Sequence, residues 1–511
     1  MPNEVIAAPA APAVQETPHL RRVLGRRDLV LLFVVAVFNL NVLPSVAANG
    51  GVTIWLWIIS LLLFFWPQGI AVIELAHRFP GEGGVYLWAK EVFGDFHGFL
   101  SGWCYWTNNM MYVPTVMLYF VGVSVFTLGP SHAYLADNKF FALTVSLALL
   151  AVLVVLNVVG LGVGKWINNV GGFGTFVAAS LLIGLGIIVS LRFGTSVTWT
   201  DFQIPADRHS VFNAFGVICF GLVGLELASI MGDEIERPDK TLPGAVAWGG
   251  ILSGALYLCA TLTLLIAVSK QDISVLQGIV QAVSHMAAKV GVGWIIAPFA
   301  FLLSLSIAGI GSAWLGGSAR IPFVAGLDSY MPSWMGKIHP KYATPYAALI
   351  VHALVSMLLV VFNFSGGWLW NKFMRVSIVW SAIRGVGSDP ARWLATDSGV
   401  QETFQKLLSL AVVLQLVPFL YMFGALLKIA FQRGFLKGHY SRPTLVLSGF
   451  FGLVTTILGI GLAFFPAQQI TSLRSYETWM FGGTLAFIAL AAFFFFIYGG
   501  RKAARKLAAA A

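Results

Sequence analysis

Long apolar stretches recur at short intervals along the whole chain, and this feature constrains the fold more than any other. A helix that crosses a bilayer needs about 20 mostly apolar residues. Twelve stretches meet this requirement, namely 29–48, 52–75, 97–128, 140–160, 167–191, 210–231, 243–268, 292–317, 345–364, 404–430, 444–465 and 477–499. Only 10% of the 511 residues are charged, against about 25% in soluble domains. The sequence therefore predicts an all-α membrane protein with twelve transmembrane helices, and it excludes a soluble enzyme, a disulfide-rich secreted domain and a disordered chain.

The basic residues indicate how these helices lie in the membrane. If the N-terminus is cytoplasmic, about two thirds of the 31 Lys and Arg residues fall on the cytoplasmic side, as the positive-inside rule requires. We therefore expect a multi-pass protein of the plasma (inner) membrane, with a disordered cytoplasmic tail at 1–28 and a second cytoplasmic tail at 500–511. The formal net charge of +10 suits a surface of anionic lipid, so nucleic acid is not an expected partner.

Two of the predicted spans contain residues that interrupt helices. The first span carries Asn39-Leu40-Asn41 ahead of Pro44 and Ser45, and the sixth carries Phe220-Gly221-Leu222-Val223-Gly224 ahead of Glu226. Proline removes a helical N–H, and backbone left unpaired at membrane depth usually lines a cavity. A simple kink at Pro44 and close helix packing at the glycines are the structural alternatives.

The positions of these breaks favour a transporter. Inverted-repeat transporters have discontinuous helices in spans one and six, where half-helix N-termini bind an anionic group of the substrate. Exposed carbonyl groups at the same breaks can accept hydrogen bonds from an ammonium group. An amino acid needs that combination, so the two interrupted stretches are the candidate substrate-binding site.

Glu226 is the one carboxylate that we place well inside a span. Burying a carboxylate in a membrane is costly, which makes Glu226 a candidate for gating or proton coupling; a purely structural hydrogen-bonded role is the alternative. In the third span, Asn108 and Asn109 lie deep enough to face the cavity. Acidic residues also follow span six beside Arg237 and Lys240, and we expect them to brace an inner gate: Asp233, Glu234 and Glu236.

The sequence contains no cluster of residues that predicts catalysis. Its histidines and acidic residues are scattered, no metal-type spacing of ligands occurs, and no phosphate-binding loop is present. We therefore expect no enzyme activity, no metal and no cofactor, and transport would draw on an ion gradient, including protons, or on exchange. The oligomeric state is left open.

The chain resembles the amino acid–polyamine–organocation (APC) superfamily of secondary transporters from about Arg26 to Tyr498. The most specific motif is FGLVGLELASIMGDEIERPDKTLPGA at 220–245, and the segments at 74–94 and 318–349 match the inner loops of the family. The resemblance implies a LeuT-type fold, with five-helix repeats at 29–191 and 210–430, a long outer loop at 365–403 and two accessory helices at 444–499.

The resemblance also implies roles for single residues. Phe220 would be the aromatic gate beside the substrate, the carbonyls of Gly221, Leu222 and Val223 would meet its amino group, and Glu226 would be the gating carboxylate. The chain departs from the family pattern in span one, where Asn39-Leu40-Asn41 replaces a Gly-Ser-Gly-type turn. We expect an amino acid exchanger or proton symporter; a polyamine or organocation carrier and a non-transporting amino acid sensor are the alternatives.

Overall fold

The structure is a computed structural model. It describes residues 22–195, 197, 199–203, 209–268, 273–328, 330–358, 361, 400–432, 435–467, 470 and 473–510. Nearly all of the predicted outer loop at 365–403, and residues 1–21 of the predicted N-terminal tail, lie outside these residues.

Long apolar helices dominate the described part of the chain. Nine helical stretches within it are long and apolar enough to cross a membrane: Val52–Arg78, Asp95–Leu128, Phe140–Val159, Gly164–Phe193, Pro238–Ala267, Gly293–Gly326, Phe404–Ala430, Arg442–Leu462 and Tyr476–Gly499. They comprise α3 (Val52–Ser60), η1 (Leu61–Phe65), α4 (Trp66–Arg78), α6 (Asp95–Ser124), η2 (Val125–Leu128), α7 (Lys139–Val159), α8 (Leu161–Phe193), α11 (Pro238–Ala267), α13 (Ile296–Ser318), α14 (Arg320–Leu327), α16 (Val400–Ala430), α17 (Arg442–Leu462) and α18 (Leu473–Ala510). The prediction of an all-α membrane protein is confirmed.

Two of the three other predicted spans are each divided into two helices. The first is divided into α1 (Arg26–Val37) and α2 (Leu43–Ala47), and the sixth into α9 (His209–Gly221) and α10 (Leu227–Ile230). The span predicted at 345–364 contains the shorter helix Tyr346–Leu358, which ends at the limit of the described residues. The total of twelve spans therefore stays a prediction.

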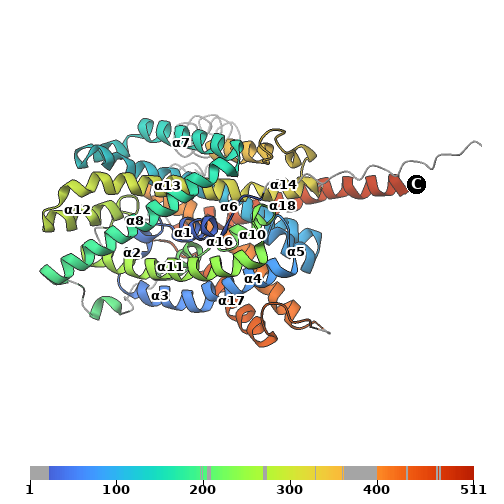
Figure 1. Ribbon diagram of the computed structural model, residues 1–511, viewed down its shortest axis with the longest axis horizontal. Helices are drawn as coiled ribbons and strands as arrows, with labels where there is room; N and C mark the ends of the chain where they lie inside the picture. Colours follow the sequence, from blue (N-terminus) through green and yellow to red (C-terminus); the bar gives the residue numbers. More distant parts are fainter. Residues whose placement is uncertain are drawn as a thin grey trace, which may run out of the picture.

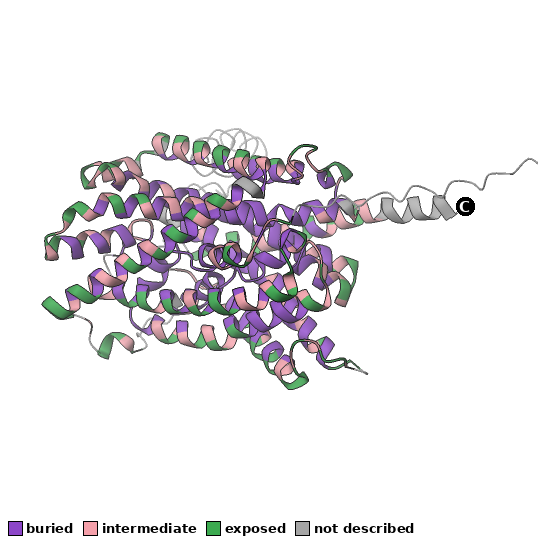
Figure 2. Ribbon diagram, viewed as in Figure 1, coloured by how far each residue is buried: buried purple, intermediate pink, exposed green. Residues whose placement is uncertain are grey.

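The helices run mainly along the long axis of the molecule, with α1, α6 and α16 in its middle (Figure 1). Buried residues concentrate on these central helices, and exposed residues on the outer faces (Figure 2). Two short helices, α5 (Val85–Phe93) and α12 (Gly278–Val290), lie at opposite ends of the molecule (Figure 1). We call the end that holds α5, α10 and α14 the α5 end.

Local sequence explains both breaks. Pro44 lies in the first turn of α2, where its missing N–H removes no helical hydrogen bond. In the other break, Gly224 has a φ of +138°, which a residue with a side chain rarely adopts. A Cβ atom on Gly224 would also come within 3.0 Å of the carbonyl carbon of Ala36 in α1. The second break therefore passes close against the first helix, and it can do so because position 224 has no side chain.

Candidate functional site

The two helix breaks are joined by one side chain, Tyr257 of α11. Its hydroxyl oxygen lies 2.6 Å from the carbonyl oxygen of Val37 and 2.7 Å from that of Gly221, and it accepts a hydrogen bond from the N–H of Asn39 at 2.8 Å. The ring stacks on Trp57 with 4.2 Å between ring centroids. Tyr257 therefore holds the end of α1 and the end of α9 in a fixed relation.

A second aromatic residue, Tyr112 of α6, closes the same region from another side. Its hydroxyl donates to Oδ1 of Asn41 at 3.2 Å. Its ring packs edge-on against Phe220, with ring centroids 5.2 Å apart. Phe220, Asn39 and Asn41 are all buried. The predicted aromatic residue and the predicted Asn-Leu-Asn turn therefore both contact Tyr112 in a buried region.

Several polar groups of the breaks have no partner among the described residues. In the first break these include the N–H groups of Leu40 and Asn41 and the side-chain amide nitrogens of Asn39 and Asn41, together with three acceptors, namely Oδ1 of Asn39 and the carbonyls of Phe38 and Asn41. In the second break they are the carbonyl groups of Leu222 and Val223. Buried polar groups are nearly always hydrogen-bonded, so unpaired ones at a helix break indicate a place for a ligand. The carbonyl of Gly221, also predicted to meet the substrate, has one hydrogen-bond partner, the hydroxyl of Tyr257 at 2.7 Å.

Glu226 is buried and accepts hydrogen bonds from four neutral groups. Gln68 of α4 donates to Oε2 at 2.8 Å, as does the N–H of Gly224 at 2.9 Å. Tyr105 of α6 donates to Oε1 at 3.0 Å, and Gln415 of α16 lies 3.4 Å from the same atom. Four donors on two oxygens suit an ionised carboxylate. The charge of Glu226 is therefore stabilised by dipoles from three neighbouring helices and from its own break.

The other predicted substrate residues lie around this centre in different ways. Asn108 donates to Oε1 of Gln415, so it belongs to the surroundings of Glu226. Ser45, in α2, receives a hydrogen bond from Gln405 of α16 at 3.1 Å. Asn109 donates to the carbonyl of Tyr105 in its own helix, and no side-chain hydrogen bond joins it to either break among the described residues.

Four residues of the site were missed or given little weight in the sequence: Gln68, Tyr105, Tyr257 and Gln415. A Tyr near the end of a predicted span is usually an interfacial anchor, but Tyr105 is buried against Glu226. A single neutral polar residue in an apolar span is common, and its spacing does not name a partner in another helix. The only sequence signal was that Gln68 and Gln415 are polar residues deep inside apolar runs.

At the α5 end, the acidic residues that follow span six are not equivalent. Glu234 is buried and accepts hydrogen bonds from Arg320 of α14, with both distances 3.1 Å. Asp233 and Glu236 are exposed. The N–H groups of Val23 and Leu24 donate to the carbonyl of Glu234 at 2.9 and 3.0 Å. These contacts join the start of α1, the end of α10 and α14, so the α5 end is closed in this conformation.

Comparison with known proteins identifies the family. The model of the amino acid permease family matches residues 24–490. The chain belongs to this family. The resemblance to APC permeases seen in the sequence is thereby confirmed.

Individual relatives of this permease are distant but similar in length. An uncharacterised transporter of Legionella pneumophila is 25% identical over 485 residues, which cover 92% of the permease and 96% of that relative. A probable agmatine/putrescine antiporter of Lactococcus lactis is 27% identical over 65% of the permease and 70% of its own length. The crystal structure of MhsT in complex with L-phenylalanine shares the fold, with a TM-score of 0.57, 14% identity and coverage of 93% and 100% of the two chains. The predicted LeuT-type architecture is confirmed at the level of the fold.

Proposed function

We propose that this permease carries amino acids across the plasma membrane by alternating access, as an exchanger or a proton symporter. The observation that supports this most directly is the complementary pair of breaks. One break offers unpaired N–H groups at Leu40 and Asn41, and the other offers unpaired carbonyls at Leu222 and Val223. A carboxylate accepts from the first set and an ammonium group donates to the second, so an α-amino acid satisfies both.

In this proposal the side chains of Asn39 and Asn41 take over the role of the Gly-Ser-Gly-type turn that this chain lacks. Their unpaired amide nitrogens are donors to the substrate carboxylate. Phe220 and Tyr112 form the wall against the substrate side chain. Ser45 and Asn108 position these groups through α16, Gly224 supplies the tight turn, and Glu226 is the gating or proton-coupled group.

Since one relative is a probable agmatine/putrescine antiporter, polyamine transport is the rival function. The hydrogen bonds of Glu226 argue against it. A dication would need carboxylate oxygens, and both oxygens of Glu226 already accept hydrogen bonds from protein groups. A buried charge without a partner is costly, so we favour a zwitterionic substrate over a polyamine.

Counterflow in proteoliposomes tests this function. Vesicles are preloaded with unlabelled acidic, neutral or basic amino acids, or with putrescine, and uptake of each labelled compound is followed at two pH values. We expect uptake that requires a preloaded amino acid for exchange, or uptake driven by an imposed proton gradient for symport.

Two outcomes would contradict the proposal. Uptake of putrescine without uptake of any amino acid would show a polyamine carrier. No flux of any compound, from protein that binds an amino acid in a thermal-shift assay, would show a sensor that does not transport.

A further inference from the structure

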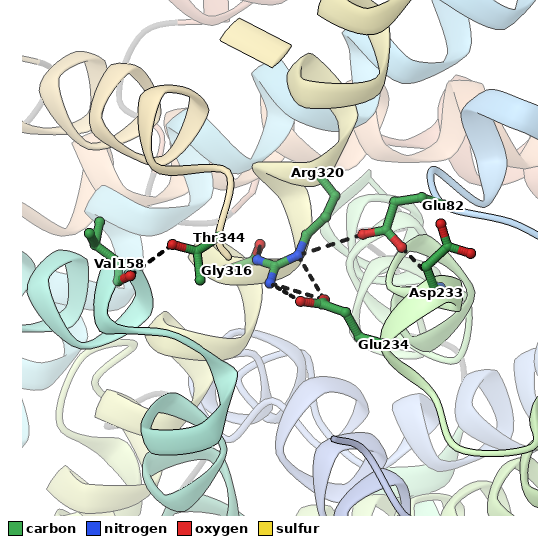
Figure 3. A network of polar contacts seen from close by, with 7 residues as sticks. All are labelled: Glu82, Val158, Asp233, Glu234, Gly316, Arg320 and Thr344. Atoms are coloured by element: carbon green, nitrogen blue, oxygen red, sulfur yellow. Dashed lines mark hydrogen bonds and ion pairs between the residues drawn. The ribbon is translucent and has the colours of Figure 1, made fainter. Parts of the chain in front are cut away.

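One arginine lies between two carboxylates at the α5 end, away from the substrate site. Arg320 donates to both oxygens of Glu234, and Glu82, from the loop before α5, approaches from the other side (Figure 3). The side chains of Arg320, Glu82 and Glu234 are 1%, 7% and 3% exposed. The cluster therefore carries two potential negative charges against one fixed positive charge, with almost no contact with water.

The carboxylates of Glu234 and Glu82 differ in their hydrogen bonds to Arg320. Nε and Nη2 of Arg320 form a two-pronged contact with Glu234, whereas Oε1 of Glu82 lies 3.9 Å from Nε, beyond hydrogen-bond distance. The N–H of Asp233 donates to Oε2 of Glu82 at 3.1 Å, and Oε1 has no hydrogen-bond partner among the described residues. Glu234 is thus matched to the arginine, and the unpaired oxygen belongs to Glu82.

The pKa shifts also distinguish Glu82 from Glu234. Burial raises the pKa of Glu82 well above its usual range, the charge of Glu234 raises it further, and Arg320 acts in the opposite direction. The exposed carboxylate of Asp233 adds a smaller contribution of the same sign as Glu234. Burial also raises the pKa of Glu234, but Arg320 and its hydrogen bonds oppose that shift directly.

We propose that Glu82 is a proton-binding site, which takes up one proton from the solution at the α5 end when this end closes and releases it when this end opens. The proposal rests on the opening of the α5 end that alternating access requires. In the closed conformation Glu82 is neutral, and the Arg320–Glu234 pair carries one charge of each sign. When the end opens, water reaches all three side chains and both carboxylates ionise. Proton uptake and release occur on one side of the membrane, so the site makes closure sensitive to the pH on that side without carrying protons across.

The direction of the pH dependence follows from the raised pKa. The closed state binds a proton that the open state does not hold above the ordinary pKa of a glutamate, so closure is favoured at low pH. This preference for the closed state is lost as the pH rises toward the raised pKa of Glu82 in the closed state. Between the two values, the open fraction grows by up to about tenfold per pH unit.

Hydrogen–deuterium exchange of the purified full-length protein tests the proposal without any substrate. The readout is the exchange of the N–H groups of Val23, Leu24 and Glu236, whose bonds close the α5 end. Since the intrinsic exchange rate itself rises with pH, each variant is compared with the wild type at the same pH, from pH 5 to pH 9. A failure of the transport assay would leave this result interpretable, because exchange reports opening alone.

The number of carboxylates left beside Arg320 predicts how fast each variant exchanges. Glu82→Gln and Glu234→Gln each leave one carboxylate for Arg320, so both should stay closed without the pH-dependent opening of the wild type. The double variant leaves Arg320 without a carboxylate and should exchange at least about 100-fold faster at every pH. Glu91→Gln, on the exposed face of α5, is the matched control and should follow the wild type.

Equal exchange in the wild type and in Glu82→Gln across the whole pH range would overturn the proposal. A double variant as protected as the single ones would also overturn it, because the charges would then not govern closure. If the double variant does not fold, the two single variants decide the matter, since both must remove the same pH dependence.

Discussion

The hydroxyl group of Tyr257 is a single point on which both helix breaks depend. It has one hydrogen to donate and lies within hydrogen-bond distance of two carbonyls, those of Val37 and Gly221, while it accepts from the N–H of Asn39. Without it, these three backbone groups would be buried with fewer partners. The hydroxyl therefore stabilises the separation between the ends of α1 and α9 as well as the folded state.

Removal of this hydroxyl in Tyr257→Phe should lower transport at least tenfold and cost about 1–3 kcal/mol in the free energy of unfolding. The counterflow rate and a thermal unfolding curve of the purified protein measure the two effects. Tyr476→Phe is the matched control, because Tyr476 is also buried and its hydroxyl also donates to a carbonyl, that of Ala463, away from the breaks. Equal losses of transport in both variants would show that Tyr257 acts only on stability.

Glu226 differs from an ordinary buried carboxylate in that its four partners are neutral donors. In Glu226→Gln an amide NH2 group would replace one carboxylate oxygen, and the two donors that bind this oxygen would lose their acceptor. The loss is limited because Oε1 of Gln68 has no partner and can turn to accept. We expect a folded protein, destabilised by about 1–3 kcal/mol, whose transport varies less with pH than that of the wild type, since only the contribution of Glu82 remains.

Counterflow rates from pH 5 to pH 8 measure this effect. Glu477→Gln, an exposed position on α18, should keep the wild-type profile. A Glu226→Gln protein whose rate still varies with pH as the wild type does would assign Glu226 a structural role only.

Among the elements, the second break depends on Gly224 more than on any other residue. An alanine there would be held at a φ of +138° and would press its Cβ against Ala36. We expect Gly224→Ala to lose at least about 2 kcal/mol, from backbone strain and from displacement of α1. Thermal unfolding of the purified variant measures this loss.

The control for this change is Gly184→Ala in α8, where an added Cβ would meet no atom within 4 Å. It should leave the unfolding temperature unchanged or raise it slightly, since alanine favours a helix. A Gly224→Ala protein as stable as Gly184→Ala would mean that the break does not need the left-handed conformation.

Both breaks could be predicted from the sequence because proline, asparagine and glycine act on their own backbone. Pro44 favours the start of a helix and Gly224 allows a positive φ, so each break could be placed from its own residues. The partners of Glu226 could not be predicted in this way. Gln68 and Gln415 are 158 and 189 residues away from it along the chain, and only the packing of α4 and α16 brings them to the carboxylate. The burial of Arg320 against Glu234 could not be predicted for the same reason, since the two residues are 86 positions apart in the chain.

At the scale of the whole molecule, the placement of α5 and α12 at opposite ends allows the orientation to be tested (Figure 1). Lys289 of α12 and Glu91 of α5 are both exposed. With cytoplasmic termini, an impermeant thiol reagent added to intact cells should label Lys289→Cys, and it should label Glu91→Cys only after the cells are permeabilised. Cys259, the exposed one of the three native cysteines, is replaced by alanine in both proteins. The reverse labelling pattern would show that the termini face outward.

The position of Glu226 has an electrical consequence. The break that carries it divides span six, so its charge lies part of the way through the low-dielectric layer, where the membrane voltage falls. Moving one elementary charge across 100 mV corresponds to about 2.3 kcal/mol, and a charge near the middle experiences about half of this. A voltage that is negative on one side therefore changes how readily a proton reaches Glu226 from each side. We expect the membrane voltage, and not pH alone, to affect the rate at which this permease works.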